Sequence, residues 1–293
     1  MNGILLINKP IDYTSRDVVN KLTKILKTKK IGHTGTLDPI ATGVLVVCVG
    51  NTTKLCELLT SEYKEYIATI KLGIKTDTLD TTGNIIEEKE YNVTENQIKE
   101  VLNSFLGTSI QTTPIYSAVK VNGKKLYEYA RAGEQVELPK REINITNIEL
   151  EINITNIELL SFKDNEIKFK TTVSKGTYIR ALIDDICTKL NTVGTMSSLI
   201  RTKQGKFTLE ETFTLSDIEN GKYELIPIEK ALSEIETVSI DEEIYNKVKN
   251  GAIITKNFNN DYANLQYNNK IVAIYKTYDK DDKLAKPFKM FIN

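Results

Sequence analysis

The feature that most constrains the fold of this chain is an uninterrupted apolar run, Val44 to Val49, which follows a loop rich in glycine and threonine, GHTGTLDPIATG. The run is far shorter than the roughly 20 apolar residues that a membrane-spanning helix needs. A short continuous apolar run bounded by a loop is typical of a buried strand. A chain of 293 residues can cover such a strand as one large domain, or as a main domain with a small one appended.

Local patterns place further elements around this strand. A helix is predicted to begin at Thr14 or Ser15, and short runs of Val, Ile and Tyr after Ile240 fit a small β module. The acidic stretch near 207–240 is predicted to end the main domain. In full, the patterns predict strands at 4–7, 44–49, 63–72 and 168–173, and helices at 15–26, 94–106, 125–131 and 178–190.

A perfect tandem duplication occupies residues 142–159, where EINITNIEL is followed by a second EINITNIEL. Nine is an odd number, and side chains on a strand alternate between faces with period two. A single straight strand through both copies would therefore put equivalent residues on opposite faces. We predict that one copy pairs in the sheet while the other extends, loops or bulges outside it. Either copy fits the register.

Charge is balanced overall but unevenly distributed, with 39 basic and 39 acidic residues. The segment 207–245 holds 2 basic and 11 acidic residues, which offsets an excess of basic residues elsewhere. Basic and acidic residues number 8 and 4 in 1–60, 6 and 3 in 120–141, and 9 and 4 in 163–206. Local surface charge is what meets a phosphate backbone. The basic blocks fit a nucleic-acid partner, and solvated faces without a partner are the alternative.

Several kinds of chemistry are disfavoured. The chain lacks GxxxxGK[ST], GxGxxG and GxSxG motifs. It has a single histidine, and its cysteines, Cys48, Cys56 and Cys187, are spaced neither as a disulfide framework nor as a zinc site. We expect no cofactor and no metal. The N-terminus lacks a signal-peptide layout, so we expect a cytoplasmic protein that does not enter a membrane.

The remaining candidates are ordinary when taken singly. Asp38 precedes a proline and fits a turn, His33 fits the same loop, Tyr66 fits a strand, and Arg180 fits a surface pair near a helix start. Taken together, four blocks resemble the bacterial tRNA pseudouridine synthases of the TruB type, in the order of that family. The blocks are KIGHTGTLDPIATGVL (30–45), YKEYIATIKLG (63–73), QTTPIYSAVKVNGKKLYEYAR (111–131) and SKGTYIRAL (174–182). The opening GILLINKP and LIRTKQGKF (199–207) are similar too.

This resemblance implies an α+β protein with the pseudouridine synthase fold. A central mixed or antiparallel sheet flanked by helices is expected in a catalytic domain at 1–236. An RNA-binding loop insertion is expected at 111–135, and a small PUA-like RNA-binding module at 237–293. The implied reaction converts the uridine at position 55, in the T loop of tRNA, to pseudouridine.

The resemblance also assigns catalytic residues. Asp38 matches the catalytic aspartate, Arg180 the arginine that pairs with it, and Tyr66 the tyrosine that stacks on the target base. An ionised carboxylate suits this chemistry, because it can form a transient covalent bond and leave again. Attack at C6 of the base, attack at C1′ of the sugar and initial removal of a ribose proton all stay open. The base must be extruded from its stack to reach the carboxylate.

Further matches concern substrate binding. His33, Tyr178 and Leu199 match substrate contacts, and Lys120 and Arg131 lie in the segment that covers the T arm in the family. The implied partner is tRNA, with no obligatory protein partner, and we expect a monomer. Two other functions stay open at this point. One is a non-catalytic T-arm RNA-binding protein or tRNA-folding chaperone, and the other is a guide-RNA-dependent pseudouridine synthase.

Overall fold

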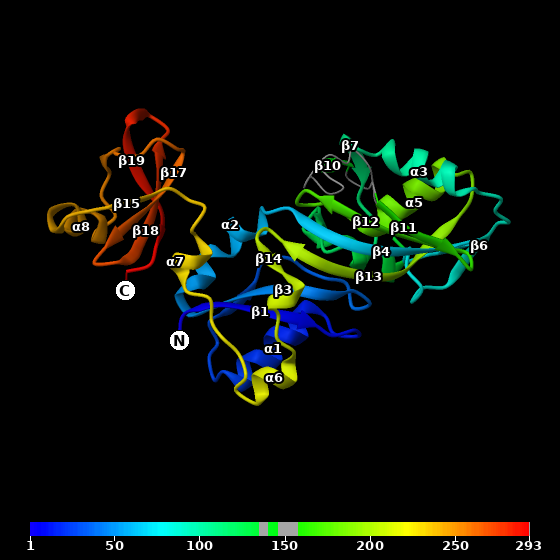
Figure 1. The fold of residues 1–293 in the computed structure, drawn as a ribbon, viewed down its shortest axis with the longest axis horizontal. Helices are drawn as coiled ribbons and strands as arrows, with labels where there is room; N and C mark the ends of the chain where they lie inside the picture. Colours follow the sequence, from blue (N-terminus) through cyan, green and yellow to red (C-terminus); the bar gives the residue numbers. More distant parts are fainter. Residues whose placement is uncertain (135–139, 146–157, 293) are drawn as a thin grey trace.

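A long mixed sheet forms the centre of the molecule in a computed structural model that describes residues 1–134, 140–145 and 158–292 (Figure 1). Its strand order is β1-β3-β13-β4-β12-β11, with β2 beside β3 and β14 beside β13. All pairs are antiparallel except β13 with β3. The strands are β1 (Gly3–Lys9), β2 (Ile31–His33), β3 (Thr42–Val49), β4 (Lys64–Leu72), β11 (Glu158–Lys163), β12 (Glu166–Val173), β13 (Gly194–Gln204) and β14 (Phe207–Thr208).

The apolar run in β3 is buried on both faces, as its composition predicts. Val44 and Val46 face one core cluster, whereas Leu45 and Val47 face another. The second cluster is closed by helix α1 (Ser15–Ile25), which begins at the N-cap Thr14 with its apolar stripe turned inward. β3 is therefore a central strand that needs cover from both sides.

Two helices cover one face of β4, β12 and β13. They are α3 (Glu95–Asn103), capped by Thr94, and α5 (Ile179–Lys189). Their buried residues join those of the three strands in the largest core cluster, which includes Ile98, Leu182 and Phe169. The predicted strands and helices of the main domain are thus present, with ends that differ by a few residues.

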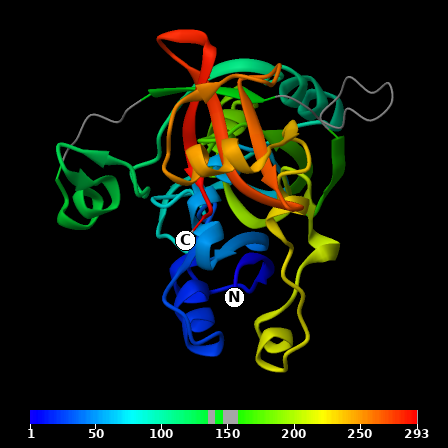
Figure 2. The ribbon, with the colours of Figure 1, turned by 90° about the vertical axis from the view of Figure 1, so that its left-hand side faces the viewer.

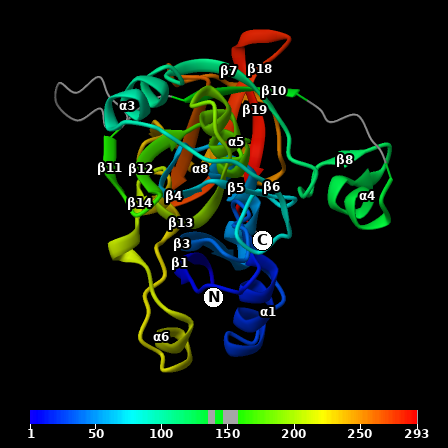
Figure 3. The ribbon, with the colours of Figure 1, turned by 90° about the vertical axis from the view of Figure 1, so that its right-hand side faces the viewer.

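Three small pairs of strands stand apart from the central sheet: β5 (Ile74–Thr76) with β6 (Ile85–Glu88), β7 (Gly107–Thr112) with β10 (Lys140–Ile145), and β8 (Lys120–Val121) with β9 (Lys124–Lys125). The last pair leads into α4 (Leu126–Ala132), which matches the predicted helix at 125–131. We call residues 120–132 the arm. It extends away from the rest of the chain in two opposite views (Figure 2, Figure 3).

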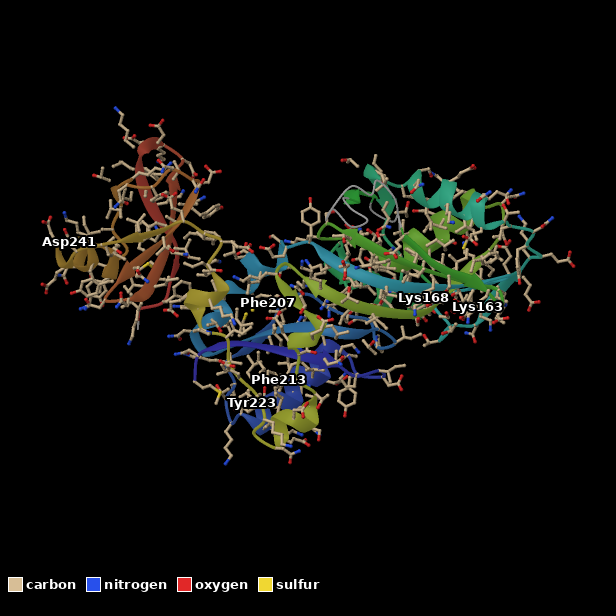
Figure 4. All side chains as sticks on the ribbon, viewed as in Figure 1. Lys163, Lys168, Phe207, Phe213, Tyr223 and Asp241 are labelled. Carbon is tan, nitrogen blue, oxygen red and sulfur yellow. The ribbon has the colours of Figure 1, made fainter. Side chains whose placement is uncertain are left out.

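The acidic segment after β14 wraps the outer edge of β1. It contains η2 (Leu209–Glu211), α6 (Leu215–Glu219) and α7 (Ile228–Ala231). Phe213 bridges to Ile7 and Ile226 bridges to Ile4, so the segment covers an edge that would otherwise be open. Figure 4 shows Phe207, Phe213 and Tyr223 following one another along this side of the molecule.

A separate five-stranded sheet closes the chain, in the order β15-β17-β18-β19-β16. Its elements are β15 (Thr237–Ser239), α8 (Glu242–Lys249), β16 (Ile254–Thr255), β17 (Tyr262–Tyr267), β18 (Lys270–Tyr278) and β19 (Asp281–Met290). The sequence patterns missed α8, whose N-cap Asp241 lies at the far end of this sheet in Figure 4. The predicted fold class, α+β with a small C-terminal β module, is confirmed, while the boundary at residue 236 stays a prediction.

The two parts share a core. Ile271 and Ile274 of β18 pack in the same cluster as Ile4 and as Leu55 of η1 (Gly50–Leu55). The adjoining helix α2 (Cys56–Thr60) is tied to β19 by the ion pair between Glu57 and Lys289. The C-terminal sheet is therefore anchored on the main domain.

The duplication falls mostly on residues 146–157, which lie outside the described residues. The start of the first copy, 142–145, belongs to β10, and the end of the second, 158–159, begins β11. These two strands belong to different sheets. Which copy is the extra one stays a prediction.

Candidate active site

One cavity of about 390 Å³ opens where the loop before β3, the start of β4 and the start of α5 meet. Its wall includes five residues predicted for the site: Asp38, Tyr66, Tyr178, Arg180 and Leu199. The remaining wall comprises Gly35, Thr36, Leu37, Thr60, Lys64, Tyr116, Ser117, Ala118, Tyr127, Val173, Ser174, Lys175, Gly176, Thr177, Ile179 and Arg201. Residues that are far apart in the sequence thus share one wall.

Asp38 and Arg180 form a two-pronged ion pair. The Nε of Arg180 donates to Oδ2 of Asp38 at 2.9 Å, and Nη2 donates to Oδ1 at 3.2 Å. The arginine side chain is 6% exposed and the aspartate side chain is 35% exposed. The guanidinium is therefore buried behind a carboxylate that stays accessible from the cavity, and its two paired donors hold both oxygens of that carboxylate.

Two backbone carbonyls fix the arginine from behind. Nη1 of Arg180 donates to the carbonyl of Thr78 at 2.8 Å, and Nη2 donates to that of Tyr116 at 2.9 Å. The start of α5 is held by Gln111, whose side chain bonds both the N–H and the C=O of Tyr178. These contacts set the direction of the fork, so the carboxylate is presented in one orientation.

The loop that carries Asp38 is anchored by buried side chains. The hydroxyl of Ser15 accepts from the N–H of Leu37 at 2.9 Å. Nζ of Lys9 donates to the carbonyls of Pro10, Tyr13 and Pro39, and Lys9 has no exposed surface. Burial is the main cause that lowers the pKa of Lys9 to about 8. The loop is thus held on both sides of the aspartate.

Tyr66 lies on β4 in the same wall and is 7% exposed. Its hydroxyl accepts from Nη1 of Arg201 at 3.5 Å. Lys64, two residues earlier and on the same face of β4, donates to the carbonyls of Thr60 and Glu62. Burial, and then the charge of Arg201, lowers the pKa of Lys64 to about 8. The wall therefore contains three buried cationic side chains, Lys64, Arg180 and Arg201, and the single carboxylate of Asp38 balances only one of these charges.

Three predicted substrate contacts lie away from this wall. His33 is half-buried on β2, where its Nδ1 accepts from the N–H of Gly35 at 3.4 Å, and burial followed by the charges of Arg16 and Arg201 lowers its pKa. A lowered pKa keeps its imidazole neutral near pH 7. Lys120 is exposed on the arm, and Arg131 lies in α4, with its side chain outside what the structure describes.

Sequence reasoning missed Lys9, Lys64, Gln111 and Arg201. Each is a polar residue in or beside a strand, and nothing in a sequence separates such a residue from one that faces solvent. The family-like segments contain all four, in KP, YKEY, QTTP and LIRT, but as context rather than as functional groups. The described ranges contain no cluster of three or more His, Cys, Asp or Glu side chains suited to a metal ion.

Comparison with known proteins decides the family. The model for "TruB family pseudouridylate synthase (N terminal domain)" matches residues 23–179. The chain belongs to the TruB family of pseudouridylate synthases. The tRNA pseudouridine synthase B of Bacillus subtilis is 47% identical over 262 residues, covering 87% of this chain and 84% of the relative. That of Bacillus cereus is 41% identical over 307 residues, covering 100% and 98%.

The solved structures agree on the fold of this TruB-family chain. An H/ACA RNP bound to a substrate RNA containing 2′-deoxyuridine contains a chain that matches with a TM-score of 0.73 and 25% identity, over 99% of this chain and 85% of that one. The likeness extends through both sheets, since nearly the whole chain is aligned. Among the helices of the described ranges, none has the length and apolar character that crossing a membrane requires.

Proposed function

We propose that this chain isomerises the uridine at position 55, in the T loop of tRNA, to pseudouridine without a cofactor. The observation that carries the proposal is the accessible carboxylate of Asp38 braced by the buried fork of Arg180, with Tyr66 on the same cavity wall. Membership of the TruB family and the names of its relatives support the substrate class.

Asp38 acts as the nucleophile in this proposal. Arg180 donates to both oxygens of the carboxylate and fixes their direction, so attack needs no reorientation. The same carboxylate serves whether the first bond forms at C6 or at C1′, or whether a ribose proton leaves first. Once the N1–C1′ bond has broken, the base turns in the cavity and rejoins the sugar through C5, after which C5 loses its proton to solvent and N1 takes up a proton.

The target base enters the cavity after leaving its stack in the T loop. Tyr66 supplies a replacement stacking face, a contact worth about 1–3 kcal/mol per base in single-stranded recognition. Tyr178 and Leu199 complete the wall around the base. His33 lies on β2, two residues before the wall begins at Gly35, and contacts the displaced RNA rather than moving protons.

The RNA around the base is held outside the cavity. Lys120 and Arg131 on the arm, within the insertion at 111–135, contact the T arm. The PUA-like module at 237–293 adds phosphate contacts. RNA loops are bound through shape, stacking and phosphate contacts, and each phosphate contact makes binding weaker at high salt. We further propose that the chain works as a monomer in the cytoplasm, where it needs no protein partner.

A tritium-release assay tests this function. A T-arm hairpin carrying 5-tritiated uridine is incubated with the purified chain alone. Release of tritium, with pseudouridine found at the target position, is the expected result. A hairpin with cytidine at that position is the control. Binding without release would favour the non-catalytic RNA-binding alternative, and activity only with added RNA would favour the guide-dependent one.

A further inference from the structure

Among the residues whose burial the structure describes, Arg201 is the largest of the fully buried side chains, with 1% of its surface exposed. No ion pair in the described part of the chain includes it, so its charge has no carboxylate partner there. Burying an unpaired cation costs several kcal/mol. A residue retained at such a cost in the wall of the catalytic cavity needs a functional explanation.

Its three nitrogens contact three different parts of the site. Nε donates to the carbonyl of Val44 on β3 at 2.7 Å, Nη2 to the carbonyl of Gly35 at 3.2 Å, and Nη1 to the hydroxyl of Tyr66 at 3.5 Å. Gly35 lies three residues before Asp38 in the same loop. One planar fork therefore bridges the loop of the carboxylate and the ring proposed to hold the base.

The strand arrangement makes this bridge rigid. Arg201 is the register partner of Tyr66 on β4 and of Gly43 on β3. Gly43 has a φ of +99°, and a Cβ added there would lie 2.3 Å from the carbonyl oxygen of Arg201. Only glycine allows β3 and β13 to approach this closely. The backbone of Arg201 is thus held between β3 and β4. Its side chain contacts Val44 on β3 and Tyr66 on β4.

We infer that Arg201 is a positioning residue that fixes the Tyr66 ring relative to the Asp38 loop, an inference that rests on the proposed function. The guanidinium carries out this role through its geometry, since three donors are aimed in one plane at three fixed acceptors. A lysine at this position keeps the charge but cannot reach all three acceptors. The distance between the bound base and the carboxylate of Asp38 is then less well fixed, which slows the chemical step while RNA binding is unchanged.

The test is a double-mutant cycle on the single-turnover rate with saturating T-arm hairpin. Arg201→Lys is expected to slow the reaction by about 100-fold and Tyr66→Phe, which removes only the hydroxyl, by about tenfold. Since both changes break the same bridge, the double variant should be slower than Arg201→Lys by about threefold or less, rather than by a further tenfold. Hairpin affinity should stay within about threefold for all three variants.

Lys203→Gln is the matched control, because Lys203 is an exposed cation on the same strand. It should react at the wild-type rate. Full additivity in the cycle, or Tyr66→Phe within threefold of wild type, overturns the inference even if Arg201→Lys fails to fold. An unchanged rate for a folded Arg201→Lys also overturns it. These results are distinct from failure of the proposed function, in which the wild-type chain itself forms no pseudouridine.

Discussion

In the cavity floor, Arg180 and Arg201 are almost fully buried and donate to backbone carbonyls, whereas Lys120 of the arm is exposed. The floor is defined as Asp38, Lys64, Arg180 and Arg201 of the cavity wall, together with Lys9, which holds the loop of Asp38 from behind. In the arm, Leu126 is the one fully buried side chain of the described residues, and Lys124 pairs with Glu134 at the surface. The floor is thus built to hold one geometry, and the arm is built to meet a partner in solvent. Changes in the floor should alter rate, and changes in the arm should alter affinity.

The largest effect is expected at Asp38. Replacement by Asn keeps the shape of the side chain but removes the nucleophile, so the single-turnover rate should fall by roughly 10⁴-fold or more while hairpin affinity is kept. Tritium release measures the rate. Asp164→Asn, an exposed change in the turn between β11 and β12, is the control. A near wild-type rate for Asp38→Asn would contradict the mechanism proposed here.

Arg180→Lys should come next, with a rate lower by about 100-fold to 1000-fold. Lysine keeps the charge but loses the paired donors to Asp38, and the carbonyls of Thr78 and Tyr116 lose theirs. Rapid-quench measurement at saturating hairpin isolates this effect from binding. If affinity falls and the rate does not, the division between floor and arm is wrong.

Lys9 offers a test of the floor through pH. Its pKa is about 8 in the folded chain against 10.5 for the ordinary side chain. Between these values the unfolded chain binds more protons, so the free energy of unfolding contributed by Lys9 is lowest below pH 8 and rises toward pH 10.5. The stability of wild type relative to Lys9→Met should therefore increase by roughly 3 kcal/mol over that interval.

Denaturant unfolding of both proteins at pH 7, 8.5 and 10 measures this difference. Subtracting the variant removes the titration of the tyrosines and the other lysines, which the two proteins share. A difference that stays constant with pH would mean that Lys9 is hydrated in the folded state.

A smaller effect is expected in the arm. Lys120→Gln should weaken hairpin binding by about threefold to tenfold and reduce the slope of log affinity against log salt by about one, while the saturated rate is unchanged. Lys163→Gln is the matched control. Lys163 is exposed at the end of β11 and pairs with Glu166 at the start of β12 (Figure 4). The cavity residue Val173 lies at the other end of β12. Equal loss in both variants would show that the arm contributes only general charge.

The smallest effect is expected from shortening the duplication. Deleting residues 146–154 leaves one intact EINITNIEL and retains every residue of β10 and β11. The deletion also keeps every described residue of the cavity wall, so the saturated rate should stay within about threefold of wild type. Thermal unfolding and tritium release together measure the outcome. A large loss of rate would place the duplication in the function of the site.

Sequence patterns located strands β1, β3, β4 and β12 and helices α1, α3, α4 and α5 because their apolar residues follow the period of each element, but they did not predict the central strand β13. They missed α8, since its five polar residues among eight give only a narrow apolar stripe. The TruB resemblance brought Asp38, Tyr66 and Arg180 forward as a set, and these side chains share one cavity. Lys9, Lys64 and Arg201 escaped notice, because their burial arises from strands that meet only in three dimensions.

The shared core of the two sheets has a consequence for exchanging parts between relatives. Ile271 and Ile274 pack in one cluster with Ile4 and Leu55, so a chain cut after residue 236 would expose the apolar side chains of Ile4 and Leu55 to water. A C-terminal module taken from another protein would pack on this main domain only if it carried apolar side chains at the positions of Ile271 and Ile274. The two parts are therefore expected to fold and to be exchanged as one unit, whatever each contributes to RNA binding.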